Sequence, residues 1–217
     1  MFTAIERDVS KALPNPKPPT AQSVRQLPTT PICRTILDYV KKELSLPVLN
    51  HSLRVYQYSL AIIKDQFDWD LSEEAVFITC LLHDLAATDG NIASTKMSFE
   101  FYGGILSHDL IMKYSNDKDL AEAVCEAIIR HQDLGESGMI TTLGLILQIS
   151  TILDNVGLHM HLIHESTLKE VNTKYSRDGW LGCFSDTIKL ETQTKPWCHT
   201  TSIENFSEKV LSNKAKY

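Results

Sequence analysis

Apolar residues recur at steps of three and four along most of the chain from residue 31 onward, which is the period of amphipathic helices. Ser72 can cap one of these stretches, and Glu73 and Glu74 follow in its first turn, where the helix dipole favours anions. The sequence of residues 176–200 predicts a loop with at most a short helix. No stretch alternates between apolar and polar residues cleanly enough to predict a strand. The fold class is therefore all-α, a helical bundle. The pattern predicts helices over residues 31–45, 48–67, 72–87, 97–114, 117–131, 141–156, 161–175 and 202–213.

The first 30 residues have a different character. Six of the eight prolines of the chain lie before residue 32. Because proline fixes φ and lacks an N–H group, such a segment cannot form the interior of a helix. We therefore predict a Pro-rich extended arm over residues 1–30, laid on the domain or partly disordered, and a helical domain over residues 31–217.

Length and charge narrow the classes of function. A chain of 217 residues is long enough for one domain with a substantial core and short for two. Its net charge is −6 and no block of Lys or Arg exceeds two residues, which argues against a nucleic-acid partner and favours a small-molecule substrate. The sequence leaves open whether the chain forms a homo-oligomer.

The cysteines and the apolar runs indicate a compartment. Five cysteines form no Cys-x-x-Cys pair and several lie in apolar helical stretches, which is typical of free thiols in a reducing environment. No apolar run approaches about 18 residues, so neither a signal peptide nor a membrane span is predicted. We expect a cytoplasmic protein without membrane association.

The His83-Asp84 pair is the strongest chemical signal. On a helix, His83 continues an apolar stripe with Val76 and Cys80, and Asp84 continues another with Phe77, so both side chains point toward the core. An ionised carboxylate in an apolar setting costs several kcal/mol unless a cation or hydrogen bonds compensate it. A lone His-Asp pair is more often a core histidine beside a capping aspartate, so further ligands are needed for a metal site.

Further polar side chains accompany the pair on other predicted helices. His51 shares a stripe with Val55, Asp154 continues Leu147 and Ser150, and His131 follows Ile128. Helical bundles build metal sites from ligands that project inward from facing helices. The sequence therefore predicts a metal site in the core among these residues.

The order His51…His83-Asp84…Asp154 resembles the H…HD…D signature of the HD superfamily, which implies a helical fold with a metal held by these four residues. A closer resemblance, over roughly residues 30–200, is to the fungal cyanamide hydratases, also called urea hydro-lyases. The stretches that carry it are Pro47–Val55, Leu81–Leu85, Lys96–Gly104, Ile129–Asp133, Leu143–Gln148 and Leu153–Gly157.

The resemblance implies an enzyme, a hydro-lyase that hydrates cyanamide to urea with one zinc ion; Fe²⁺ or Mn²⁺ would suit the ligands less well. Zinc with an open position lowers the pKa of bound water to about 7, which supplies a hydroxide to attack the nitrile carbon. We expect His131 and Lys96 to be catalytic, with His131 as the proton donor. Asn155 and His108 are candidates for binding substrate.

Three alternatives remain open. His108 and His131 could hold a second metal, as in dinuclear HD enzymes. The chain could be an HD phosphohydrolase acting on a nucleotide or another phosphomonoester, although Leu85-Ala86-Ala87 stands where those enzymes often have a glycine and then a basic residue. It could also be a catalytically silent interaction module, although such a domain would be expected to have lost a ligand.

Gly103 and Gly104 lie inside a predicted helix, where glycine is unfavourable relative to alanine. The surrounding pattern is not that of a phosphate-binding loop. The pair therefore predicts close helix packing or the approach of a small ligand.

Overall fold

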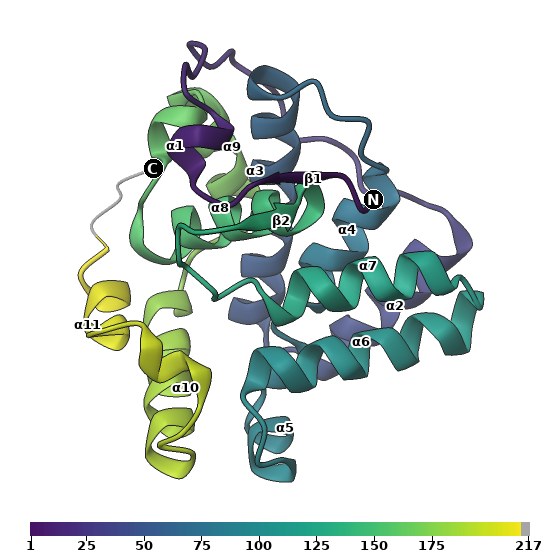
Figure 1. Cartoon of the computed structure of the whole chain (residues 1–217), viewed down its shortest axis with the longest axis vertical. Helices are drawn as coiled ribbons and strands as arrows, with labels where there is room; N and C mark the ends of the chain where they lie inside the picture. The colour runs from purple at the N-terminus through teal and green to yellow at the C-terminus, as the bar shows by residue number, and fades with distance from the viewer. Residues whose placement is uncertain (214–217) are drawn as a thin grey trace.

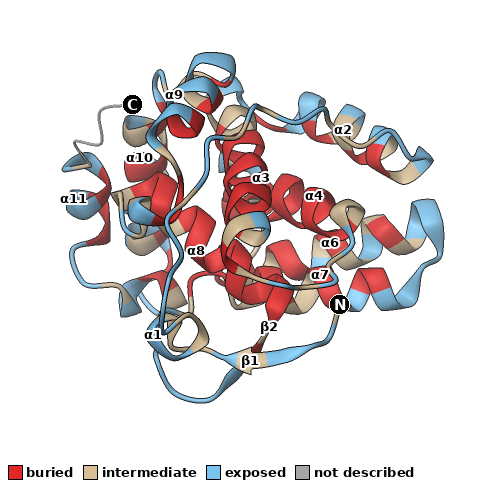
Figure 2. Cartoon of the chain, turned by 90° about the horizontal axis from the view of Figure 1, so that it is seen from above, coloured by how far each residue is buried: buried red, intermediate tan, exposed pale blue. Residues whose placement is uncertain are grey.

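Helix α3, Leu46–Gln66, lies at the centre of the molecule and is buried along most of its length (Figures 1 and 2). The structure, a computed structural model, describes residues 1–213. The expected all-α bundle is confirmed, with one small two-stranded sheet added to it. The other elements, in chain order, are β1 (Ala4–Glu6), α1 (Val9–Ala12), α2 (Pro31–Glu43), α4 (Glu73–Leu82), the 3-10 turn η1 (Leu85–Ala87), α5 (Asp89–Ser94), α6 (Phe99–Ser115), α7 (Lys118–Ile129), β2 (Met139–Thr141), α8 (Thr142–Val156), η2 (Met160–Leu162), α9 (Glu165–Lys174), α10 (Trp180–Thr194), η3 (His199–Ser202) and α11 (Phe206–Leu211).

The position of α3 follows from its sequence. Pro47 stands in its first turn, where the missing N–H group costs no helical hydrogen bond. From His51 to Ile62 every side chain is buried, because α4, α8, α9 and α10 pack around the helix. Several polar side chains in this stretch hydrogen-bond inside the core, as in the bond from the Ser59 hydroxyl to Ser150 at 2.9 Å. The centre of the bundle is therefore the place where polar chemistry is buried.

Helices α6 and α7 pack side by side as an antiparallel pair (Figure 1). The two adjacent glycines of α6 permit the close approach. A Cβ atom on Gly104 would lie 2.6 Å from Cγ1 of Ile129 and 3.0 Å from the carbonyl oxygen of Cys125, both on α7. Gly103 faces Ala86 and Ile128 at ordinary contact distance. Of the two expectations for these glycines, close helix packing is confirmed.

The N-terminal arm lies on its own chain. Strand β1 pairs antiparallel with β2, with Ile5 opposite Ile140. Further along, the arm is extended and follows α3, where Gln66 and Gln57 each exchange two hydrogen bonds with its backbone, at Lys17 and Arg25. Side-chain amides thus take the place of a partner strand, which explains how a Pro-rich segment is held without regular structure.

Several parts of the sequence-based assignment were wrong. Residues 176–200, expected to be mostly loop, contain the 15-residue helix α10. Its buried stripe of Trp180, Phe184 and Ile188 has helical spacing, but the glycines around it argued for a loop. Strands β1 and β2 were not expected, because three residues are too few to show alternation.

Across residues 1–213, none of the helices combines the length and the apolar character that crossing a lipid bilayer requires.

The glycine contacts predict opposite effects for two Gly→Ala substitutions. Gly104→Ala should lower the free energy of unfolding by about 1–3 kcal/mol, because the new methyl group overlaps Ile129 and the Cys125 carbonyl. Gly182→Ala, in α10, should raise it by up to about 1 kcal/mol, because no atom lies within 4 Å of the place that its Cβ would take. Urea denaturation of the two variants and the parent measures both; a stabilised Gly104→Ala would contradict the packing described here.

Candidate metal centre

Three buried side chains bring ligand atoms together in the core. They are His51 on α3 and the consecutive residues His83 and Asp84 after α4, and one ligand atom of each lies within 4.8 Å of the others. The Nε2 atoms of His51 and His83 are 3.1 Å apart. Oδ2 of Asp84 lies 3.2 Å from Nε2 of His83 and 3.6 Å from Nε2 of His51. Atoms at these separations can bind one ion simultaneously.

The end of α4 makes this convergence possible. The sequence predicted a helix continuing to about Ala87, but α4 stops at Leu82 and a 3-10 turn begins at Leu85. Asp84 lies between them with φ −103° and ψ 14°. Adjacent residues of a continuous helix point about 100° apart. The break in the helix therefore lets His83 and Asp84 face the same point.

The histidines have their second ring nitrogen fixed by an acceptor. Nδ1 of His83 lies 2.8 Å from the Cys80 carbonyl oxygen, and Nδ1 of His51 lies 2.6 Å from Oδ2 of Asp154. A carbonyl or carboxylate oxygen can only accept, so Nδ1 carries the proton in each ring. Nε2 is then left with its lone pair, as in metal-binding histidines generally.

The protonation states suit a cation. Burial lowers the pKa of His51 to about 4, so this imidazole is neutral at physiological pH. Burial alone would raise the pKa of Asp84, but the imidazoles of His83, His51 and His131 hold it below its usual range. Burial lowers the pKa of His83, yet the adjacent Asp84 outweighs this and raises it, so protons and a metal ion compete for that nitrogen.

The Asp84 carboxylate also has an oxygen atom without a hydrogen-bond partner among residues 1–213. Its Oδ1 atom is buried and has no hydrogen-bond donor within the described residues. A buried carboxylate oxygen without a partner is strongly unfavourable. A divalent cation bound by His51, His83 and Asp84 would satisfy the carboxylate, so the residues present fit a metal.

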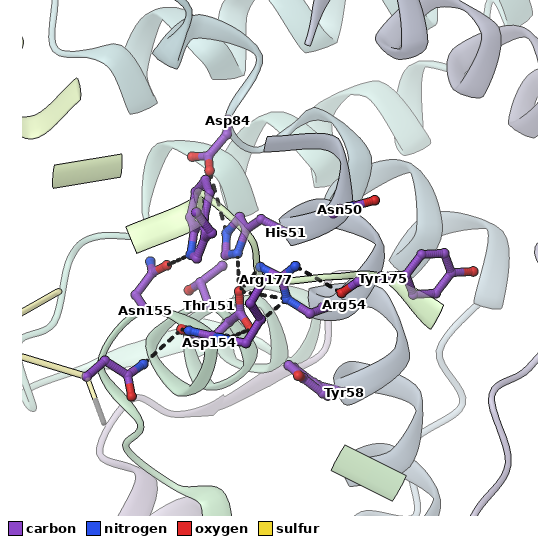
Figure 3. A network of polar contacts seen from close by, with 12 residues as sticks. Asn50, His51, Arg54, Tyr58, Asp84, Thr151, Asp154, Asn155, Tyr175 and Arg177 are labelled. Carbon is purple, nitrogen blue, oxygen red and sulfur yellow. Dashed lines mark hydrogen bonds and ion pairs between the residues drawn. The ribbon is translucent and has the colours of Figure 1, made fainter. Parts of the chain in front are cut away.

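Asp154, the fourth expected ligand, does not join this group. Its carboxylate lies at Nδ1 of His51, on the opposite side of the ring from His83 and Asp84 (Figure 3). There it accepts hydrogen bonds from Arg54 and Arg177. The helix position predicted from sequence was right, since Asp154 is fully buried, but spacing along a helix does not tell which neighbour the carboxylate contacts.

His131 and Asn155 lie close to the three-residue group. The Nε2 atom of His131 is 3.9 Å from Oδ1 of Asp84, and its Nδ1 lies 2.7 Å from the Ile128 carbonyl oxygen. His131 follows the end of α7 rather than lying on it. Burial, with the neighbouring His83, lowers its pKa. A cavity of about 10 Å³ is lined by His131, Asn155 and Thr151, the last of which no sequence pattern indicated.

Lys96 and His108 lie elsewhere. Lys96 is exposed on the segment before α6, and its carbonyl oxygen accepts a hydrogen bond from Trp197. His108 is partly exposed and its ring lies 3.3 Å from the Asp109 carboxylate, in a groove lined by Phe2. The expected roles of these two residues in catalysis and substrate binding have no geometric support, because long stretches of apparent similarity do not fix which side chains turn inward.

Three residues near the centre were not predicted from the sequence to belong to it. Arg54 follows His51 by one helical turn and is fully buried, and Arg177 precedes α10. The ring of Trp180 stacks on that of His51 with a centroid distance of 3.9 Å and an interplanar angle of 10°, and its Nε1 donates to Asn155. The i, i+3 spacing of His51 and Arg54 could have indicated that Arg54 lies near the centre. Nothing in the sequence around Arg177 indicated its position.

Comparison with known proteins agrees with this geometry. The family model described as the HD domain matches residues 48–156, which span all three residues of the group. Two relatives from Saccharomyces cerevisiae, Cyanamide hydratase DDI2 and Cyanamide hydratase DDI3, are each 51% identical to the chain over 219 aligned positions. The alignments cover 100% of this chain and 97% of each relative.

The geometry predicts that metal content depends on Asp84 and not on the outlying candidates. The parent protein should hold about one metal ion per chain, and Asp84→Asn should lose most of it because the anionic oxygen facing two imidazoles is removed. Elemental analysis after gel filtration measures the metal, and far-UV circular dichroism checks the fold.

Lys96→Ala and His108→Ala serve as matched controls and should keep the metal content of the parent. Two ions per chain, or loss of metal in His108→Ala, would contradict a single site at His51, His83 and Asp84.

Proposed function

The chain belongs to the HD-domain family and, within it, to the cyanamide hydratases, and we propose that it hydrates cyanamide to urea at a zinc ion held by His51, His83 and Asp84. The Asp84 carboxylate is the observation that carries the metal: its Oδ2 atom faces the imidazole nitrogens of His51 and His83, and its buried Oδ1 atom has no donor within the described residues. Full-length identity of 51% to proteins named cyanamide hydratase carries the substrate.

The ligand set favours zinc. Two imidazoles and one carboxylate with a position left for water form a common catalytic zinc site, while Fe²⁺ and Mn²⁺ are less favoured alternatives. Zinc held there would lower the pKa of a water molecule toward neutrality and would polarise an adjacent substrate. The side chains around the ion must perform every other function that the reaction needs.

His131 is the residue best placed to move the proton. Water must lose a proton when its oxygen attacks the nitrile carbon, and the nitrile nitrogen must gain one. With Nδ1 fixed on the Ile128 carbonyl, Nε2 is the atom that accepts this proton and donates it to the substrate. Because burial lowers the pKa of His131, the ring is neutral and ready to accept before each turnover.

Asn155 is proposed to orient the substrate. Its Oδ1 atom accepts the hydrogen bond from Trp180, which leaves its NH₂ group available to a ligand in the cavity that it lines. Thr151, one helical turn earlier on α8, adds a hydroxyl to the same wall. Neutral polar groups beside the apolar side chains of Leu134 and Ile152 suit a small uncharged molecule.

The same surroundings disfavour the phosphohydrolase alternative. A phosphate substrate calls for several convergent cations. Arg54 and Arg177 are the cations near the metal ligands, and both bind Asp154. Cyanamide is uncharged and needs no such cations, so it is the better match in charge.

A direct comparison of the two reactions tests the proposal. We expect rapid urea formation from cyanamide and no phosphate release from nucleoside monophosphates or aryl phosphates, measured side by side on one zinc-loaded sample. Treatment with a chelator should abolish urea formation, and zinc should restore it. Phosphate release faster than urea formation would refute the hydratase assignment, and neither activity would favour the silent module.

A second test concerns His131. His131→Gln should lower kcat for urea formation by a factor on the order of 10²–10⁴, which is typical for loss of a general acid–base group. Zinc content should stay near that of the parent, because His131 is not among the three grouped ligands. Loss of zinc together with activity would instead make His131 a ligand.

A further inference from the structure

We infer that Asp154 is a positioning residue, clamped by Arg54 and Arg177 against the far nitrogen of His51, and not a ligand of the metal. The inference rests on the proposed metal site and departs from the four-ligand set implied by the sequence. It assigns two arginines, through Asp154, a part in setting the geometry of the centre.

The carboxylate has no acceptor site left for a metal. A carboxylate offers about four lone-pair directions. Nε of Arg54 donates to Oδ1 at 3.0 Å, and Nη1 of Arg177 donates to the same oxygen. Nη2 of Arg54 donates to Oδ2 at 2.7 Å, and Nδ1 of His51 donates to it at 2.6 Å. Four donors therefore occupy the two oxygens.

The charges around the two carboxylates also place the metal away from Asp154. Asp154 and Asp84 are both buried, but only Oδ1 of Asp84 lacks a donor. Two guanidinium groups already balance the Asp154 carboxylate. The site for a cation is thus on the Asp84 side of His51.

The clamp acts on the metal through the His51 ring. Asp154 fixes Nδ1 as the protonated nitrogen and increases the basicity of Nε2, the atom that faces His83 and Asp84 (Figure 3). Arg177 makes a second bond at 2.7 Å to the backbone oxygen of Asp154, so it holds the residue as well as the charge. The ring is held from its face by Trp180.

This ligand set determines whether the metal has a coordination position open for water. With His51, His83 and Asp84 as the chain's ligands, zinc keeps a position for the reacting water. A fourth carboxylate ligand would fill that position and reduce the positive charge that activates the water. Removing Asp154 from the ligand set therefore favours the proposed hydration.

Zinc affinity and cobalt absorption test the inference on the full-length protein. Asp154→Asn should bind zinc about 10–100-fold more weakly, because the ring loses its anionic partner. The visible absorption of the cobalt-loaded variant should keep the parent band pattern, because no metal–ligand bond is lost. Asp84→Asn, which removes a ligand, should change that pattern.

Variants of Arg177 provide a second test of the inference if Asp154→Asn folds poorly. Arg177→Gln should weaken zinc binding toward the lower end of the same range, and Arg177→Lys should recover part of the loss, because it restores the charge without the planar fork. Arg34→Gln, at an exposed site on α2, is the control and should bind zinc like the parent.

The decisive measurement is the crystal structure of the zinc-loaded parent. The Asp154 oxygens should stay on Arg54 and His51, beyond about 3 Å from zinc, whereas a carboxylate ligand lies at about 2.0–2.2 Å. A zinc–Asp154 bond in a protein that still forms urea would overturn this inference alone. Failure of the parent to bind any metal would refute the proposed function and this inference together.

Discussion

The structure depends on the buried ion pair between Arg54 and Asp154. Removing two charged groups from water costs several kcal/mol for each, so a pair of this kind persists only where hydrogen bonds satisfy both partners. Here they do: Arg54 contacts both oxygens of the carboxylate and also the backbone oxygens of residues 175 and 176. The pair therefore joins α3, α8 and the segment that leads into α10, three parts of the chain far apart in sequence.

The ion pair also separates two kinds of electrostatic environment around one imidazole ring. On the Nδ1 side of His51 every acceptor has a donor and two guanidinium groups are present. On the Nε2 side lie a second imidazole nitrogen and a carboxylate oxygen without a donor. The cation that we propose would therefore lie on the second side. The ring, covered on its face by Trp180, connects the two and keeps the distance between them fixed.

The small cavity beside this centre is lined both by side chains of α8 and by side chains from less regular parts of the chain. Thr151 and Asn155 project from α8, and His131 is fixed by the carbonyl of Ile128 at the end of α7. The outer wall is formed by apolar side chains from outside the central helices, among them Leu134 and Ile203. The polar groups that we propose to contact the substrate are thus held by the core helices, beside apolar side chains.

The sequence by itself determined the helical bundle and the burial of the two histidines and one aspartate that the tertiary structure brings together. Helical periodicity is local, and a His or Asp on an apolar stripe must turn inward, so these features could be found without a structure. Only the tertiary structure decided that Asp154 contacts arginines instead of the other ligands, and that Lys96 and His108 lie outside the site. Contacts of this kind depend on where α4 ends and on how α10 returns to α3, and both are set by packing between residues distant in sequence. Period and spacing give the direction of a side chain from its own helix, but not the partner that it meets there.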